Sequence, residues 1–162
     1  MPITVRTVVA AVLALAAFPA AAQSRLEPGE WEVTSSTEIP GSYMGPIEQT
    51  ERRCYTTSDA KLYADKDAWA ADMVAATDQN CRAKDLKQSG TALSVTLLCD
   101  GDTRIDLLHD FQGATGSMQT RVARGQEPGT KSTYALKRVA EKCSPDTIEQ
   151  WKAWHPGQTF AP

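Results

Sequence analysis

The sequence has none of the short motifs that mark common enzyme active sites. It contains no Gly-x-Ser-x-Gly, no His-Glu-x-x-His and no phosphate-binding loop, and its only histidines are His109 and His155. A nucleophilic mechanism normally places a base beside the nucleophile, and histidine is the commonest base. An enzyme is therefore the less favoured interpretation, and we expect no cofactor.

An excess of positive charge and a long apolar run are also missing. The 17 basic residues are outnumbered by 20 acidic ones, which gives a net charge of −3 at pH 7. A mildly acidic chain of mixed sign is a poor partner for nucleic acid or for an anionic membrane surface. No apolar run approaches the roughly 20 residues that a spanning helix needs, so we expect no integral membrane segment in the mature chain.

Residues 1–22 have the pattern of a secretion signal. Arg6 supplies a basic start, Val8–Phe18 is a short apolar run, and the small residues Ala20 and Ala22 precede the expected cut before Gln23. No cysteine follows the cut, so no lipid anchor is expected. The pattern predicts export to the periplasm, one β-rich domain over residues 23–143 and a C-terminal tail over residues 144–162.

The four cysteines have no metal-binding or redox spacing. They are Cys54, Cys81, Cys99 and Cys143, and no pair forms a Cys-x-x-Cys motif. An even number of cysteines behind a secretion signal is typical of structural disulfides in an oxidising compartment. We expect two disulfides and no metal site.

Alternation of apolar and polar residues predicts a mainly β (α+β) fold. In Glu30–Ile39, every second residue from Trp31 to Ile39 lies on one face, and the polar residues between them should face water. Pro-Gly turns flank the run. Further strands are expected over about 47–55, 82–87, 92–99, 103–111, 117–123 and 131–139. About seven short strands of this kind form a curved antiparallel sheet or a half-open barrel.

Two segments break the β pattern. Asp59–Thr77 has helical spacing of apolar residues and should hold one or two helices, with Thr57 or Ser58 as the cap. After Cys143, the tail should form a short helix with Ser144 as its N-cap and Pro145 in its first turn.

The helical insertion constrains the disulfides. If it carries the chain back along the sheet, Cys81 and Cys99 meet at one end of the sheet and Cys54 and Cys143 at the other. Helices of roughly 15–20 residues are long enough to do so. We therefore favour Cys81–Cys99 and Cys54–Cys143, and the other two pairings stay open.

Four stretches of the sequence resemble a known family. They are "PGEWEVTS", "IPG", "RCYTTSDA" and "LLCDG", which begin at Pro28, Ile39, Arg53 and Leu97, and a cysteine follows the last strand. Together they resemble the domain of unknown function numbered 3617, a family of small exported bacterial proteins, over about Leu26–Cys143. The resemblance implies a signal peptide, a periplasmic location and paired cysteines, and it implies no activity. The tail and the "KRVAEKC" segment depart from the family pattern.

The candidate ligand-pocket residues are Trp31, Ser35, Thr37 and His109. His109 shares a strand face with apolar neighbours, and Ser35 and Thr37 place hydroxyls on the inner face of the first long strand. A histidine in such a place is more often a hydrogen-bonded core residue than a catalyst, and a tryptophan is more often a packing residue than a ligand contact. Asp106 and Asp110 should lie on the strand face opposite His109, so the acidic groups of Asp100–Asp110 do not converge on a calcium site by local geometry.

The sequence does not identify a biochemical activity. The favoured interpretation is a small exported module, stabilised by disulfides, that binds a small hydrophobic ligand or an envelope protein. The alternatives are a hydrolase-like enzyme that uses His109 and a purely structural protein without a small-molecule site. No catalytic residue is assigned.

Overall fold

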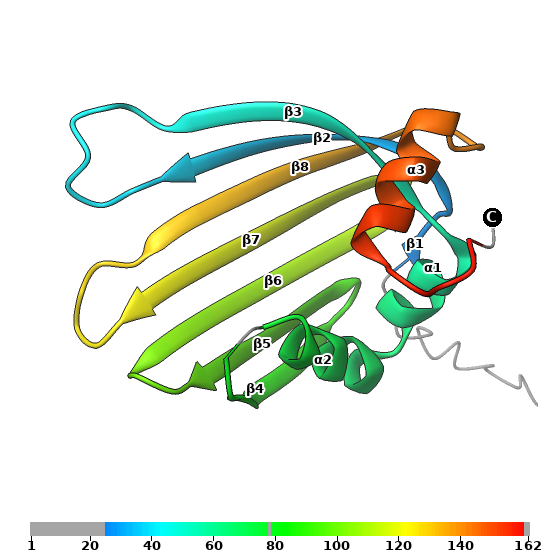
Figure 1. The fold of residues 1–162 in the computed structure, drawn as a ribbon. Helices are drawn as coiled ribbons and strands as arrows, with labels where there is room; N and C mark the ends of the chain where they lie inside the picture. Colours follow the sequence, from blue (N-terminus) through cyan, green and yellow to red (C-terminus); the bar gives the residue numbers. More distant parts are fainter. Residues whose placement is uncertain (1–24, 78, 161–162) are drawn as a thin grey trace, which may run out of the picture.

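The computed structural model of the chain describes residues 25–77 and 79–160, so the expected signal peptide, residues 1–22, lies outside the described residues. The described residues form an eight-stranded curved sheet that does not close, and three helices (Figure 1). The predicted mainly β fold class is confirmed. None of these helices has both the length and the apolar character needed to cross a membrane.

The elements follow the predicted order, with one short strand added at the start. They are β1 (Arg25–Leu26), β2 (Gly29–Glu38), β3 (Ile47–Tyr55), α1 (Thr57–Ala64), α2 (Lys66–Ala75), β4 (Cys81–Ser89), β5 (Ala92–Cys99), β6 (Thr103–Gly113), β7 (Thr115–Arg124), β8 (Thr130–Ala140) and α3 (Pro145–Trp154). The spatial order of the strands is β3-β2-β8-β7-β6-β5-β4, and neighbours on this path are antiparallel. The two-residue β1 pairs in parallel with the end of β6.

The helical insertion carries the chain from one edge strand to the other. It leaves β3 at Tyr55 and enters β4 at Cys81, and Figure 1 shows α1 and α2 lying across the sheet between these edges. Cys54 is bonded to Cys143 at the end of the sheet where β2 begins. Cys81 is bonded to Cys99 at the opposite end, where the two residues are cross-strand partners. This is the pairing that the crossover argument favoured.

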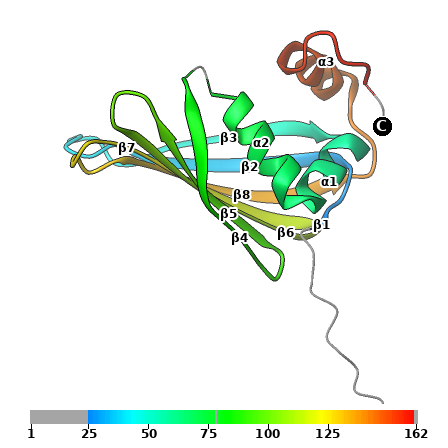
Figure 2. The same ribbon diagram turned by 90° about the horizontal axis from the view of Figure 1, so that it is seen from below.

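One face of the sheet, here called the inner face, carries the hydrophobic core. Trp31, Leu93 and Phe111 are completely buried there, and Trp69 of α2 is buried against the same cluster. Trp31 meets Phe111 edge-on, with the ring centroids 6.1 Å apart. Figure 2, turned by 90° from Figure 1, shows the twist of the sheet and the position of α3 apart from α1 and α2.

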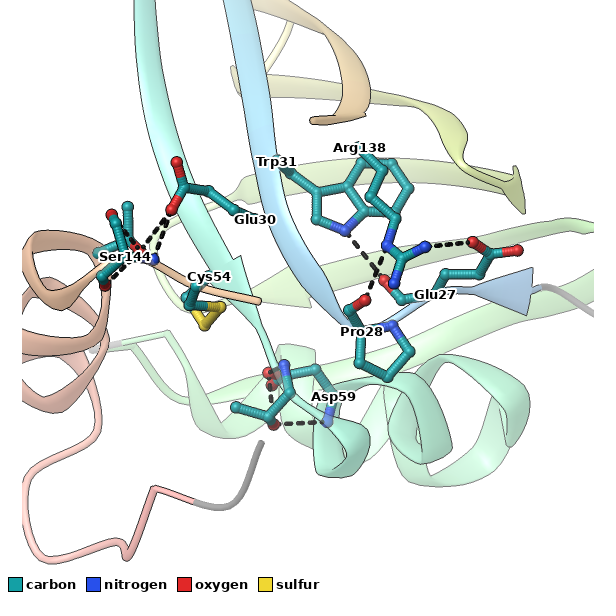
Figure 3. The surroundings of a disulfide bond; sticks show 11 residues. Glu27, Pro28, Glu30, Trp31, Cys54, Asp59, Arg138 and Ser144 are labelled. Carbon is teal, nitrogen blue, oxygen red and sulfur yellow. Dashed lines mark hydrogen bonds and ion pairs between the residues drawn. A yellow bond between two sulfur atoms is a disulfide. The ribbon is translucent and has the colours of Figure 1, made fainter. Parts of the chain in front are cut away.

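The Pro28–Trp31 stretch of the opening motif is structural in this fold (Figure 3). The guanidinium Nε of Arg138 donates to the carbonyl of Pro28 over 2.8 Å. Gly29 has φ +138°, and a Cβ there would lie 2.4 Å from the carbonyl oxygen of Ala140. The glycine is therefore needed for close approach of the backbones of β2 and β8.

The helix caps differ from the prediction in two places. Thr56, not Thr57 or Ser58, caps α1, because its hydroxyl accepts from the backbone of Asp59 while the Asp59 carboxylate accepts from the Thr56 backbone. Ser144 occupies the N-cap position of α3 as expected, but its side chain makes no capping hydrogen bond.

The cap of α3 comes instead from β2. Oε2 of Glu30 accepts from the Ser144 backbone over 2.6 Å and from the Thr147 hydroxyl over 3.1 Å, and Figure 3 shows the first of these bonds next to the Cys54 disulfide. Burial alone would raise the pKa of Glu30, but these hydrogen bonds, together with Arg52, lower it below its usual range. The expectation that the outer face of this strand is open to water is wrong at Glu30, which α3 covers.

Candidate ligand-binding site

A cavity of about 520 Å³ lies over the inner face, bounded by α1, α2 and the C-terminal segment. The sheet contributes the half-buried or buried side chains Leu107, His109, Met118, Thr120 and Tyr134. The helical insertion contributes Leu62, Tyr63 and Met73, and the C-terminal segment contributes Trp151, Trp154, His155 and Gln158. Walls of this aromatic and aliphatic character with a few polar groups are typical of small-molecule sites, and the volume lies in their range of roughly 300–1,000 Å³.

His109 is a buried polar residue of this wall. It lies on β6 with 6% of its surface exposed, and its Nδ1 accepts a hydrogen bond from Nε1 of Trp69 over 3.2 Å. Burial lowers the pKa of His109 to about 4, so the ring is neutral at neutral pH. Because Nδ1 is the acceptor, the proton of the neutral ring resides on Nε2.

Tyr63 of α1 stands beside His109. The two rings have centroids 5.7 Å apart, and Tyr63 also packs edge-on against Phe111 at 4.8 Å. Burial raises the pKa of Tyr63 and raises that of Tyr55 to about 12, so both hydroxyls are protonated at neutral pH. The site thus holds neutral hydrogen-bonding groups within apolar surroundings.

The charged groups in the lining are two carboxylates and one guanidinium. Asp59 is engaged in the cap of α1, and Asp72 is exposed on α2. Arg53 forms an ion pair with Glu51 and lies over the ring of Trp154, 5.0 Å from its centroid. The charges near the cavity therefore do not favour an anionic ligand.

The four sequence-predicted residues are not brought together. A row of paired residues crosses the inner face from Ser35 through Tyr134 and Met118 to His109. This places Ser35 and His109 three strands apart, roughly 14 Å. Only His109 lines the cavity.

Trp31 and Thr37 lie elsewhere on the inner face. Trp31 is completely buried, and its Nε1 donates to the carbonyl of Glu27 over 2.9 Å. The Thr37 hydroxyl is 2.9 Å from that of Ser132, towards the end of the sheet opposite the Cys54–Cys143 disulfide. Trp31 is thus placed as a packing residue, and Thr37 is satisfied by a neighbouring strand.

Sequence reasoning missed Tyr63 as a site residue and gave Trp69 no role toward His109. Both come from the helical insertion, and 40 residues separate Trp69 from His109 along the chain. The available signal was the position of Tyr63 next to Leu62 within the helical pattern, but local spacing does not show which strand a helix covers.

Two carboxylates of the Asp100–Asp110 segment, those of Asp106 and Asp110, are engaged on the outer face. Asp106 pairs with Arg104 and accepts from Thr96, and Asp110 accepts from Gln112. In the described residues, no three His, Cys, Asp or Glu side chains gather as a metal site would require. A second hollow of about 710 Å³ lies over Thr96, Arg104 and Asp106, and charged and polar residues are the majority in its lining.

The hydrolase alternative gains no second catalytic group from the geometry. Within the described part of the chain, the only side-chain hydrogen bond of His109 is the one from Trp69, and no hydroxyl or carboxylate is bonded to the ring. A base with a pKa of about 4 is also poorly matched to work at neutral pH.

Comparison with known proteins assigns most of the chain to a family. The family model described as "Protein of unknown function (DUF3617)" matches residues 26–143. The chain belongs to this family. The comparisons with curated proteins and with solved structures found no match. The DUF3617 match includes His109, Tyr63 and all four cysteines and stops before α3, which supplies Trp151 and Trp154 to the cavity wall.

Proposed function

We propose that this DUF3617 protein is an exported, non-enzymatic binding module that holds a small, largely apolar molecule in the inner cavity. The observation that carries the proposal is the cavity of about 520 Å³ with aromatic and aliphatic walls and a buried neutral histidine. A purely structural domain of this size would be expected to fill such a space with side chains, because protein interiors are close-packed.

The location is part of the same proposal. Two disulfides suit a protein that works in an oxidising compartment, and the first 22 residues have a signal-peptide pattern. We expect the mature protein in the periplasm with Gln23 as its first residue. An intact N-terminus on exported protein would contradict this part of the proposal.

The test is to purify the exported protein from its own periplasm and to extract it for mass spectrometry of small molecules. Thr120→Trp should fill the cavity, since Thr120 is half-buried in its wall. Gln119→Trp is the matched control, because the neighbouring residue is exposed on the opposite face. An apolar molecule recovered with the wild type and Gln119→Trp, but not with Thr120→Trp, would support the proposal.

A binding assay in vitro tests the cavity even if the natural ligand is lost during purification. N-phenyl-1-naphthylamine, a neutral apolar dye, should fluoresce on binding to the wild type and the control, and much less with Thr120→Trp. Absence of both a copurified molecule and dye binding by the folded wild-type protein would reject the proposal.

A further inference from the structure

Two polar atoms that belong to buried residues of the cavity wall have no partner among the described residues. No hydrogen bond within the described residues uses Nε2 of His109 or the hydroxyl of Tyr63, although these residues are only 6% and 9% exposed. The only described side-chain nitrogen or oxygen that is fully enclosed without a partner is Nε1 of Trp151. The two atoms must therefore open onto free space, and both residues line the cavity.

The direction of each hydrogen bond is set by neighbouring groups. Trp69 donates to Nδ1 of His109, which leaves Nε2–H as a donor toward the cavity. The Tyr63 hydroxyl is a protonated phenol that also donates. An apolar ligand that displaces water from these two donors leaves them unpaired unless it carries an acceptor, and an unpaired polar group away from water is costly.

We propose that the cavity selects an uncharged apolar molecule that carries one carbonyl-type oxygen, which accepts from His109 Nε2–H and from the Tyr63 hydroxyl. This inference rests on the proposed binding function and adds the chemical class of the ligand. A carboxylate fits less well, because the nearby charges are those of Asp59, Asp72 and an ion-paired Arg53.

The experiment uses the mature protein loaded with N-phenyl-1-naphthylamine at neutral pH. Three straight-chain competitors of equal length displace the dye: an alkane, the methyl ketone and the fatty carboxylate. We expect the ketone to displace the dye at roughly five- to tenfold lower concentration than the alkane, as a hydrogen bond of ordinary strength provides. The carboxylate should compete no better than the alkane.

Two variants identify the donors. Tyr63→Phe removes a hydroxyl that bonds nothing else in the described residues, so the fold should be unaffected, and the ketone should lose most of its advantage while alkane binding stays the same. His109→Phe should act in the same direction. Tyr43→Phe is the control, since Tyr43 is fully exposed on the hairpin between β2 and β3.

The outcomes separate the two proposals. Equal competition by ketone and alkane in the wild type, or an unchanged ketone advantage in Tyr63→Phe, would overturn the inference and leave apolar binding intact. Tightest competition by the carboxylate would overturn the neutral ligand class. If neither the dye nor any competitor binds, the binding function itself fails.

Discussion

The indole of Trp69 donates to Nδ1 of His109 over 3.2 Å and thereby selects the tautomer of the imidazole. The two rings meet at 61° with centroids 5.1 Å apart, and both residues are buried. Trp69 acts on the cavity through His109, because Trp69 is not part of the cavity lining. It is a positioning residue whose contribution can be separated from packing.

Trp69→Phe should allow the His109 imidazole to populate both neutral tautomers, and it should destabilise the fold. The hydrogen bond to Nδ1 is lost and a smaller ring leaves a void, so we expect a cost of about 2–4 kcal/mol. Nitrogen NMR of the imidazole should show Nε2–H in the wild type and a mixture of tautomers in the variant. A pure Nε2–H tautomer in folded Trp69→Phe would show that something other than Trp69 sets it.

Stability should rise with pH between about 4 and 6.5 because of His109. Burial lowers the folded-state pKa from 6.5 to about 4, so the unfolded chain binds the proton more tightly across this window. The resulting difference in unfolding free energy is about 3 kcal/mol. This stability is fully present above pH 6.5 and is lost below pH 4. Urea denaturation at several pH values measures it, and in His109→Phe the slope should fall by about one proton. Equal slopes for the wild type and His109→Phe would show that a group other than His109 causes the pH dependence.

Much of the sheet could be predicted because the pattern that determines each strand lies within the strand itself. Trp31 and Val33 alternate with polar residues, and so do Leu93, Val95 and Leu97, so burial of one face followed from period two. The crossover was also predictable, since only a chain that returns along the sheet brings the cysteines together in pairs.

The remaining features depend on contacts between distant segments. The outer face of β2 looked solvent-exposed at Glu30, because nothing in its own strand shows that α3 docks there 114 residues later. The cavity wall likewise needs Tyr63 placed next to His109. The cap at Thr56 is different, since the Thr-x-x-Asp spacing to Asp59 was present in the sequence and identifies it.

Trp31→Ala should cost about 3–5 kcal/mol of unfolding free energy. The indole is completely buried, meets Tyr55 and Phe111 edge-on, and donates to the Glu27 carbonyl. Trp154→Ala is the control and should cost less than about 1 kcal/mol, because half of Trp154 is exposed. Unchanged stability of Trp31→Ala in urea denaturation would contradict its role in the core.

Glu30→Ala should loosen α3 and cost about 1–3 kcal/mol, because the Ser144 N–H and the Thr147 hydroxyl lose their shared acceptor. The contribution is present above the unfolded pKa of 4.5 and is lost as the pH falls through the lowered folded value. Glu32→Ala is the control: among the described residues the partly exposed Glu32 carboxylate pairs only with Arg52, so this change should alter stability by less than about 0.5 kcal/mol. Equal effects of the two substitutions in urea denaturation would show that Glu30 does not cap α3.

The two disulfides should differ in their contribution to stability. Cys54–Cys143 joins residues 89 positions apart and Cys81–Cys99 joins residues 18 positions apart. In the chain-entropy model, loops of these lengths correspond to about 4–5 and about 3 kcal/mol. The double variant Cys54→Ala/Cys143→Ala should therefore be less stable than Cys81→Ala/Cys99→Ala. Peptide mapping without reduction should first recover the two linked pairs from exported protein. Links from Cys54 to Cys81 would contradict the crossover of α1 and α2, whereas four free thiols would contradict an oxidising compartment. If the pairs are as expected but the shorter loop proves the more stabilising, then the residual structure of the unfolded chain, and not loop length, governs how this sheet is held together.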